Sequence, residues 1–141
     1  MTRPAALLFM LILVTALHST NAGRQPLNFT AAPGSPFSVG QGLSDVDVID
    51  ANGDGSLDLI AATAGDRGVR VLLGDGRGSF RPGPGRPSSS DAAPHLLAAA
   101  DFNLDKKIDV ATSGHDSNGV TVLFGDGAGA FTAAAGSPLR H

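Results

Sequence analysis

Short runs of apolar and β-branched residues alternate along the chain with polar stretches rich in Asp and Gly. Runs of about 4–8 residues bounded by such turn-forming residues are typical of β-strands. The predicted strands cover residues 44–49, 57–64, 69–74, 79–82, 95–100, 108–113, 120–125 and 130–133. A stretch rich in Pro, Gly and Ser at 83–90 is expected to link the first four strands to the second four.

The whole pattern repeats along the chain. Asp50 and Asp101 open similar acidic stretches 51 residues apart, and the glycine-rich turn at 74–80 returns at 125–131 with the same spacing. Four short strands in each unit of about 50 residues are typical of a propeller blade. We therefore predict an all-β fold of β-propeller-type blades, with two four-stranded repeats of about 51 residues and the tail of a preceding blade. The expected divisions are 1–22 (signal peptide), 23–43 (end of a preceding blade and linker), 44–90 (first repeat) and 91–141 (second repeat).

The first acidic stretch is the main candidate site. Side chains that carry oxygen fall at every second position, namely Asp50, Asn52, Asp54, Ser56 and Asp58. Ca²⁺ takes six to eight oxygen ligands in flexible geometry, and Gly55 can supply the sharp turn that brings them together. A helical EF-hand would need a Glu at the twelfth position, where this chain has Ala61. We therefore predict a calcium loop between two strands, with a solvated acidic turn as the alternative.

Residues 1–22 are typical of a secretory signal peptide. Arg3 is the basic start, an apolar run follows at 5–17, and small residues precede Gly23. The run is shorter than the ~20 residues that a membrane-spanning helix needs. We expect the protein to be secreted or extracytoplasmic, with an uncleaved anchor as the alternative.

Composition narrows the classes of function. All 13 acidic residues are Asp, the chain has no Cys, Trp or Tyr, and the net charge is −3. Without a basic stripe or aromatic stacking platforms, the chain is not expected to bind nucleic acid. The glycine-rich turns lack the Lys of a phosphate-binding loop, and neither His95 nor His115 has metal-ligand spacing. No nucleophile motif accompanies Ser88–Ser90 and Asp91, so we predict no catalytic site.

The coupled motifs resemble a known family. A loop of the form Asp-x-Asn-x-Asp-Gly-x-x-Asp and a turn of the form Val-Leu-Leu-Gly-Asp-Gly-x-Gly-x-Phe together look like FG-GAP/VCBS repeats, which integrin α-subunits and many exported bacterial proteins carry. The resemblance covers about 29–138. It implies Ca²⁺ bound through side-chain oxygens of the first loop and the backbone carbonyl of Ser56. The second loop would use the equivalent residues, namely Asp101, Asn103, Asp105 and Asp109 with the carbonyl of Lys107.

The second loop departs from this pattern at one position. Lys106 replaces the turn glycine, and a non-glycine residue with positive φ costs on the order of 1 kcal/mol. Lys106 and Lys107 also place two positive charges near the expected ion. We expect the second loop to bind Ca²⁺ more weakly than the first.

Two classes of function remain open. The first is a non-catalytic, calcium-stabilised interaction or adhesion module that binds a protein or a polysaccharide. The second is an accessory segment of a secreted enzyme, or a lectin propeller. Propellers close with roughly 4–8 blades, so two blades leave open edges and faces. We therefore expect either self-association or a longer parent protein.

Overall fold

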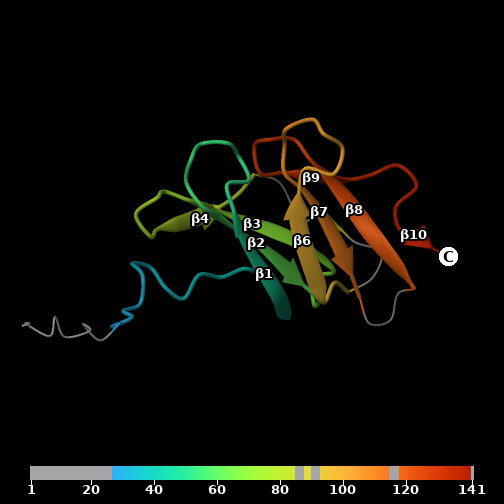
Figure 1. Ribbon diagram of the computed structural model, residues 1–141. Coiled ribbons are helices and arrows are strands. Elements are labelled where there is room, and N and C mark those ends of the chain that lie inside the picture. Colours follow the sequence, from blue (N-terminus) through green and yellow to red (C-terminus); the bar gives the residue numbers. More distant parts are fainter. Residues whose placement is uncertain (1–26, 85–87, 90–92, 115–117, 141) are drawn as a thin grey trace, which may run out of the picture.

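The computed structural model describes residues 27–84, 88–89, 93–114 and 118–140, and these residues form two antiparallel sheets (Figure 1). The predicted signal peptide over 1–22 lies outside them. Within these ranges no residue is helical, and no helix is long and apolar enough to cross a membrane. The predicted all-β, blade-like fold is therefore confirmed.

The first sheet, blade 1, is a meander of neighbouring strands. Its path is β1 (Leu43–Ile49), β2 (Asp58–Thr63), β3 (Gly68–Gly74) and β4 (Phe80–Pro82). Val46 lies opposite Ala61 in the β1–β2 pair, and Ile60 lies opposite Val71 in the β2–β3 pair. Both faces of β2 and β3 are largely buried. Their sequences are therefore nearly continuous apolar runs rather than alternating apolar and polar residues.

The second sheet, blade 2, repeats this path. Its strands are β6 (Leu96–Ala100), β7 (Asp109–Ser113), β8 (Gly119–Gly125) and β9 (Phe131–Ala133). Val110 lies opposite Leu123, as its repeat equivalent Leu59 lies opposite Leu72 in blade 1. All eight strands agree with the predicted ranges to within one or two residues.

Two further short strands lie outside the eight predicted ranges. β5 (Ser88–Ser89) pairs with the start of β3, and β10 (Leu139–Arg140) pairs with the start of β8. β4 and β9 reach only the ends of their neighbours, so the outer edge of each long strand has room for a second short partner. The expectation of a linker across 83–90 was therefore wrong at Ser88–Ser89, where a two-residue polar strand leaves no apolar pattern to read.

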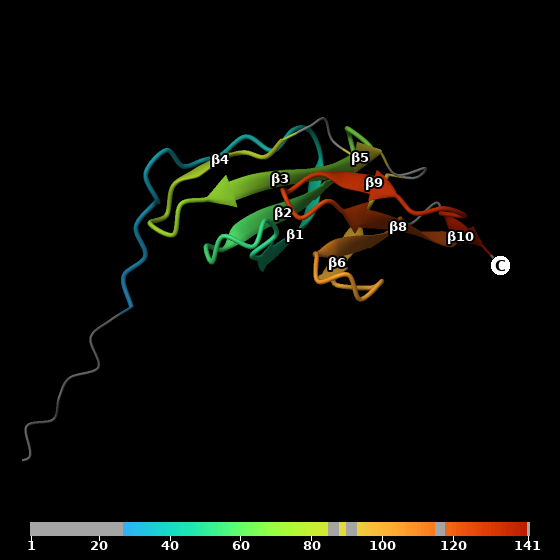
Figure 2. The same ribbon diagram turned by 90° about the horizontal axis from the view of Figure 1, so that it is seen from above.

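The two blades pack face to face (Figure 2) around one apolar cluster. Ile60 and Val69 of blade 1 and Val110 and Leu123 of blade 2 are at most 2% exposed. Each such side chain contributes roughly 1.5–3 kcal/mol through burial. This shared core belongs to neither sheet alone, so each blade depends on the other for the burial of one face.

Carboxylates of β1 join the inner edges of the two blades. Asp45 accepts hydrogen bonds from the backbone N–H of Val46 (2.9 Å) and, across the interface, of Leu97 (2.9 Å). Asp47 does the same with Val48 (2.8 Å) and Ala99 (3.3 Å). β1 and β6 are edge strands, whose outward N–H groups would otherwise need water as a partner. We call this arrangement the carboxylate clip.

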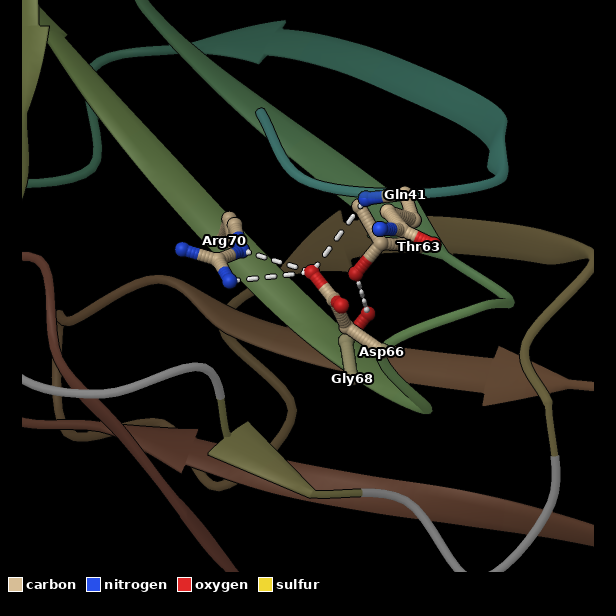
Figure 3. A network of polar contacts seen from close by, with 5 residues as sticks. All are labelled: Gln41, Thr63, Asp66, Gly68 and Arg70. Carbon is tan, nitrogen blue, oxygen red and sulfur yellow. Dashed lines mark hydrogen bonds and ion pairs between the residues drawn. The ribbon is translucent and has the colours of Figure 1, made fainter. Parts of the chain in front are cut away.

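The N-terminal segment 27–42 runs beside β4 in Figure 2. Phe37 packs edge-to-face against Phe80, with 5.2 Å between the ring centroids. Figure 3 shows where the end of the segment is held: the backbone N–H of Gln41 and the guanidinium of Arg70 both donate to Asp66, at 3.3 Å and 2.9 Å. The Arg70–Asp66 ion pair is partly exposed, so it contributes about 0–1 kcal/mol. Two backbone hydrogen bonds also hold this end, from the Ala64 N–H to the Gly42 carbonyl (2.8 Å) and from the Gly65 N–H to the Gln41 carbonyl (3.1 Å).

Candidate functional site

The first acidic loop is folded by its own carboxylates. Asp50 directly follows β1 and accepts hydrogen bonds at Oδ1 from the backbone N–H of Gly53 (2.8 Å) and Asp54 (3.1 Å), and at Oδ2 from Gly55 (2.8 Å). Gly53 and Gly55 both have positive φ, +74° and +84°, a conformation that glycine adopts without steric cost. The sequence therefore curls into a tight loop in which backbone N–H groups converge on one carboxylate.

Asn52 and Asp54 interlock within the same loop. The Asn52 side chain donates to Asp54 Oδ2 (2.8 Å) and accepts from the Asp54 backbone N–H (2.9 Å), while the backbone N–H of Ser56 donates to Asp54 Oδ1 (2.8 Å). The hydrogen bond from Asn52, and then that from Ser56, hold the pKa of Asp54 below its ordinary value. Asp54 is fully exposed and stays ionised, so it is available to a cation from solvent.

Asp58 has a different environment because it is the first residue of β2 and is fully buried. Its carboxylate accepts from the backbone N–H of Ala51 (2.9 Å) and of Gly74 at the end of β3 (2.8 Å). A buried carboxylate with two N–H partners ties the start of the loop to the third strand. The sequence identified Asp58 as a candidate ligand, and the structure adds this role in positioning the loop.

The second acidic loop repeats the arrangement. Asp101 accepts from Asp105 (3.1 Å) and Lys106 (2.8 Å), and buried Asp109 accepts from Phe102 (3.0 Å) and Gly125 (2.9 Å). The Asn103 side chain donates to Asp105 (3.2 Å), and the Lys107 backbone N–H donates to the same carboxylate (2.9 Å). The two loops lie at the same end of the molecule, at the top of Figure 1.

Backbone strain distinguishes the second loop from the first. Lys106 has φ +69°, which confirms the positive φ expected at the glycine position, and Leu104 has φ +64°. Leu104 stands where the first loop has Gly53, a substitution that the sequence analysis did not single out although the 51-residue alignment shows it. Two side chains in the left-handed region cost about 1–2 kcal/mol each, so the second loop is the more strained of the two.

The glycine-rich turns that follow β3 and β8 are tight turns, as predicted. Asp75 accepts from the backbone N–H of Arg77 (2.8 Å) and Ser79 (3.0 Å), and Asp126 accepts from Ala128 (2.7 Å) and Ala130 (3.0 Å). These backbone hydrogen bonds, those of Arg77 and Ala128 foremost, hold the pKa of both carboxyl groups below the ordinary value. A pocket of about 340 Å³ lies between the first turn and the first loop, and Ser56, Asp75 and Phe80 are among its lining residues.

The oxygens of the first loop fit a hard cation. Asp50 Oδ1 already accepts two hydrogen bonds, but Asp50 Oδ2, both oxygens of Asp54 and Asn52 Oδ1 each accept one. Each such oxygen keeps one further acceptor position, and exposed carboxylate and amide oxygens are the ligands that Ca²⁺ prefers. Across the part of the chain that the structure describes, no three acidic or histidine side chains form a ready-made metal centre.

The weaker candidates are not assembled into a site. The backbone N–H of His95 bonds to the Ser113 carbonyl (2.8 Å) beside β6 and β7, while His115, Ser90 and Asp91 lie outside the described residues. The sequence analysis missed the functional use of Asp45 and Asp47, which it took only as part of a strand. Their alternation along one face of β1 was the available signal, because residues two apart point to the same side of a strand.

Comparison with known proteins identifies one family. Residues 50–112 match the model of the FG-GAP-like repeat. The matched range begins at the first loop, includes β2 to β6 and the second loop, and ends within β7. No curated protein and no solved structure matches the chain significantly. The match confirms the resemblance that the loop and turn motifs indicated.

Proposed function

Because residues 50–112 carry an FG-GAP-like repeat, we propose that the chain is a non-catalytic, calcium-binding repeat module of an exported protein. The module binds a protein or polysaccharide ligand and acts in adhesion or a similar interaction. The calcium sites are the two acidic loops. Ser56 and Lys107 provide backbone carbonyl ligands. The side-chain ligands are Asp50, Asn52, Asp54 and Asp58 in the first loop and Asp101, Asn103, Asp105 and Asp109 in the second.

The observation that carries the proposal is the repetition of one hydrogen-bonded loop in two blades. Asp50 and Asp101 each gather backbone N–H groups, and Asp58 and Asp109 each tie the loop to a third strand. The loops are therefore preformed, and a cation needs only to displace water from the exposed oxygens. Preformed ligands lose less conformational entropy on binding than ligands on a flexible chain.

The use of the acidic side chains supports the non-catalytic part of the proposal. Each of the eleven described aspartates accepts at least one hydrogen bond from a backbone N–H. Carboxylates that accept backbone hydrogen bonds act as structural acceptors, and the exposed ones among them can also bind a metal ion. The position of both loops at one end (Figure 1) supports that end as the ligand-binding surface.

The test compares calcium binding by the whole chain with that of two loop variants. Asp54→Asn and Asp105→Asn each remove one exposed charge from a loop and keep the side-chain shape. A ligand that binds only the folded state raises stability by RT ln(1 + [L]/Kd). We expect the unfolding temperature of the wild-type chain to rise with Ca²⁺ and to fall with excess chelator. Asp54→Asn should lower this calcium response more than Asp105→Asn, because the strained second loop binds more weakly.

The matched control is Asp75→Asn, which removes the same charge from a turn outside the loops. It should leave the calcium response unchanged. A wild-type chain whose cooperative unfolding ignores Ca²⁺, or a response that survives in the Asp54→Asn/Asp105→Asn double variant, would overturn the calcium assignment. A larger response to Mg²⁺ than to Ca²⁺ would also contradict it, because Mg²⁺ demands near-octahedral geometry.

A further inference from the structure

The junction between the two blades uses one face of each. Ile60, Val69 and Leu73 point from blade 1 toward blade 2, and we call this the forward face of a blade. Leu97, Val110 and Leu123 point from blade 2 toward blade 1, and we call this the backward face. The packing is close: a Cβ added to Gly129 of blade 2 would lie 3.2 Å from Leu73 and 3.7 Å from Val71. Forward and backward faces are thus complementary surfaces.

The forward face of blade 2 is open although its residues match those of the buried face in blade 1. Val120 is the 51-residue equivalent of Val69 and is 41% exposed, where Val69 is 2% exposed. Phe124 is the equivalent of Leu73 and is 37% exposed, where Leu73 is 4% exposed. Leu96 on the same face is 64% exposed. An apolar surface of this kind on a folded protein marks an interaction site.

The inner part of the backward face of blade 1 is open as well. Val46 and Val48 are 49% and 51% exposed, and they are the equivalents of Leu97 and Ala99, which pack against the shared core. Strand alternation places Val46 and Val48 on the side of β1 opposite to Asp45 and Asp47. One chain therefore presents an open forward face and an open backward face at its two ends.

We propose that the open forward face of blade 2 docks on the open backward face of blade 1 of a second copy of this chain. The docked pair repeats the apolar part of the junction already present inside each molecule, with equivalent strands facing each other, but without the carboxylate clip, because Leu96 and Ala98 stand at the positions of Asp45 and Asp47. The two surfaces are different, so the contact is heterologous and each bound copy leaves one open face of each kind. The product is a head-to-tail assembly, either a closed ring or an open stack.

The N-terminal segment must yield at this junction. Residues 29–36 and 131–138 are 102 positions apart, twice the repeat, so they occupy the same place at a docked junction. They differ at one position out of eight, and both form the same turn: Ser35 donates to the Ala32 carbonyl and Ser137 to the Ala134 carbonyl, each at 3.0 Å. Phe29 is 92% exposed, whereas Phe131 lies in β9, paired with β8. The incoming β9 therefore displaces residues 29–36, while Gln41 stays held by Asp66.

The experiment measures the mass distribution of the whole chain and of two variants by analytical ultracentrifugation. Val120→Asp places a charge on the forward face of blade 2, and Val48→Asp places one on the backward face of blade 1. Both sites are about half exposed, so folding should survive. We expect assemblies for wild type and single chains for each variant alone. An equimolar mixture should form pairs and nothing larger, because one intact face remains on each variant.

The control is Ala128→Asp, which adds the same charge in an exposed turn and should assemble like wild type. A wild-type chain that stays single would overturn the proposal, since the faces would then be covered by something other than this chain. Association of either variant with itself would overturn the head-to-tail arrangement in favour of like-with-like contact. If circular dichroism shows that either variant is unfolded, Val46→Asp and Leu96→Lys, at positions of the same faces that are 49% and 64% exposed, decide the same question.

Discussion

Aspartate is the residue on which the local structure of this chain depends. Its carboxylate is one methylene from the backbone, so it reaches N–H groups within a few positions along the chain, whereas Glu reaches farther and loses more rotamer freedom. Asp50 bonds to residues three, four and five positions ahead, and Asp75 and Asp126 each bond two and four positions ahead. A chain without Glu is consistent with this use of carboxylates.

At this scale the strain in the second loop can be tested directly. Lys106→Gly relieves a positive φ of +69°, and the gain of about 1 kcal/mol is partly offset because glycine loses more entropy on folding. We expect the free energy of unfolding in chelator to rise by at most about 1 kcal/mol, and the calcium affinity of the second loop to rise as a charge is removed. Denaturant unfolding and calorimetric titration measure the two effects.

The reciprocal variant is the control. Gly55→Lys introduces lysine at the equivalent position of the first loop. It should lower the free energy of unfolding in chelator and the calcium affinity of the first loop. An unchanged affinity in both variants would show that neither strain nor charge at this position affects binding.

Among the elements, the meander of each blade depends on the close approach of a loop to the end of the third strand. The Gly74 N–H bonds to Asp58, and a Cβ at Gly74 would collide with the carbonyl oxygen of Leu57. Gly125 stands in the same relation to Ile108. Glycine is required at both positions because a side chain would collide with the backbone, and not because the position has a positive φ.

Gly74→Ala is therefore expected to destabilise the chain strongly. Forcing an extra methyl group into a packed site costs typically about 1–3 kcal/mol, and here the opposing atom belongs to the backbone and cannot rotate away. Thermal unfolding in the presence of Ca²⁺ measures the loss. Gly53→Ala is the comparison: its Cβ meets open space, so only the positive φ opposes it, at about 1 kcal/mol. Equal effects of the two variants would contradict the steric explanation.

The elements could be predicted well, and the reason is local. Each of the eight longer strands begins or ends at an Asp- or Gly-rich turn, so the turn chemistry marks the strand ends as clearly as the apolar runs mark the strands. β5 and β10 could not be predicted, because two residues carry no periodicity and their pairing is decided by the free edge of β3 or β8. The loops were found as candidate sites from oxygen spacing, whereas the tie from Asp58 to Gly74 depends on a strand sixteen residues away.

In the whole molecule, the carboxylate clip and the shared core hold the two blades together. Asp45 and Asp47 each accept one N–H from their own strand and one from β6. The alternation of Asp45 and Asp47 could have placed both acids on one face of β1, but their partners could not be predicted, because these are backbone N–H groups 52 positions away and leave no mark on residue identity.

The clip can be weakened without changing shape by the double substitution Asp45→Asn/Asp47→Asn. An amide offers one acceptor oxygen where the carboxylate offers two, so at each position one N–H faces an NH₂ group. Leaving a partly buried N–H without an acceptor costs roughly 1–3 kcal/mol. We expect lower stability and a less cooperative denaturant transition, as one blade loosens before the other. Asp66→Asn/Asp75→Asn, with the same charge change away from the interface, should keep a single transition. A single transition in the clip variant too would show that the apolar core alone couples the blades.

The clip also makes the two repeats unequal as building units. The positions equivalent to Asp45 and Asp47 in the second repeat are Leu96 and Ala98, which have no acceptor to offer. A gene duplication that copied the first repeat would give each new blade the two acids that bond to the backbone of the next blade. A duplication that copied the second repeat would produce blades held together by apolar contact alone. The order of such units along a chain therefore determines which junctions between blades contain the clip. A consensus unit averaged from the two would lose the acids that distinguish a firm junction from an exchangeable one.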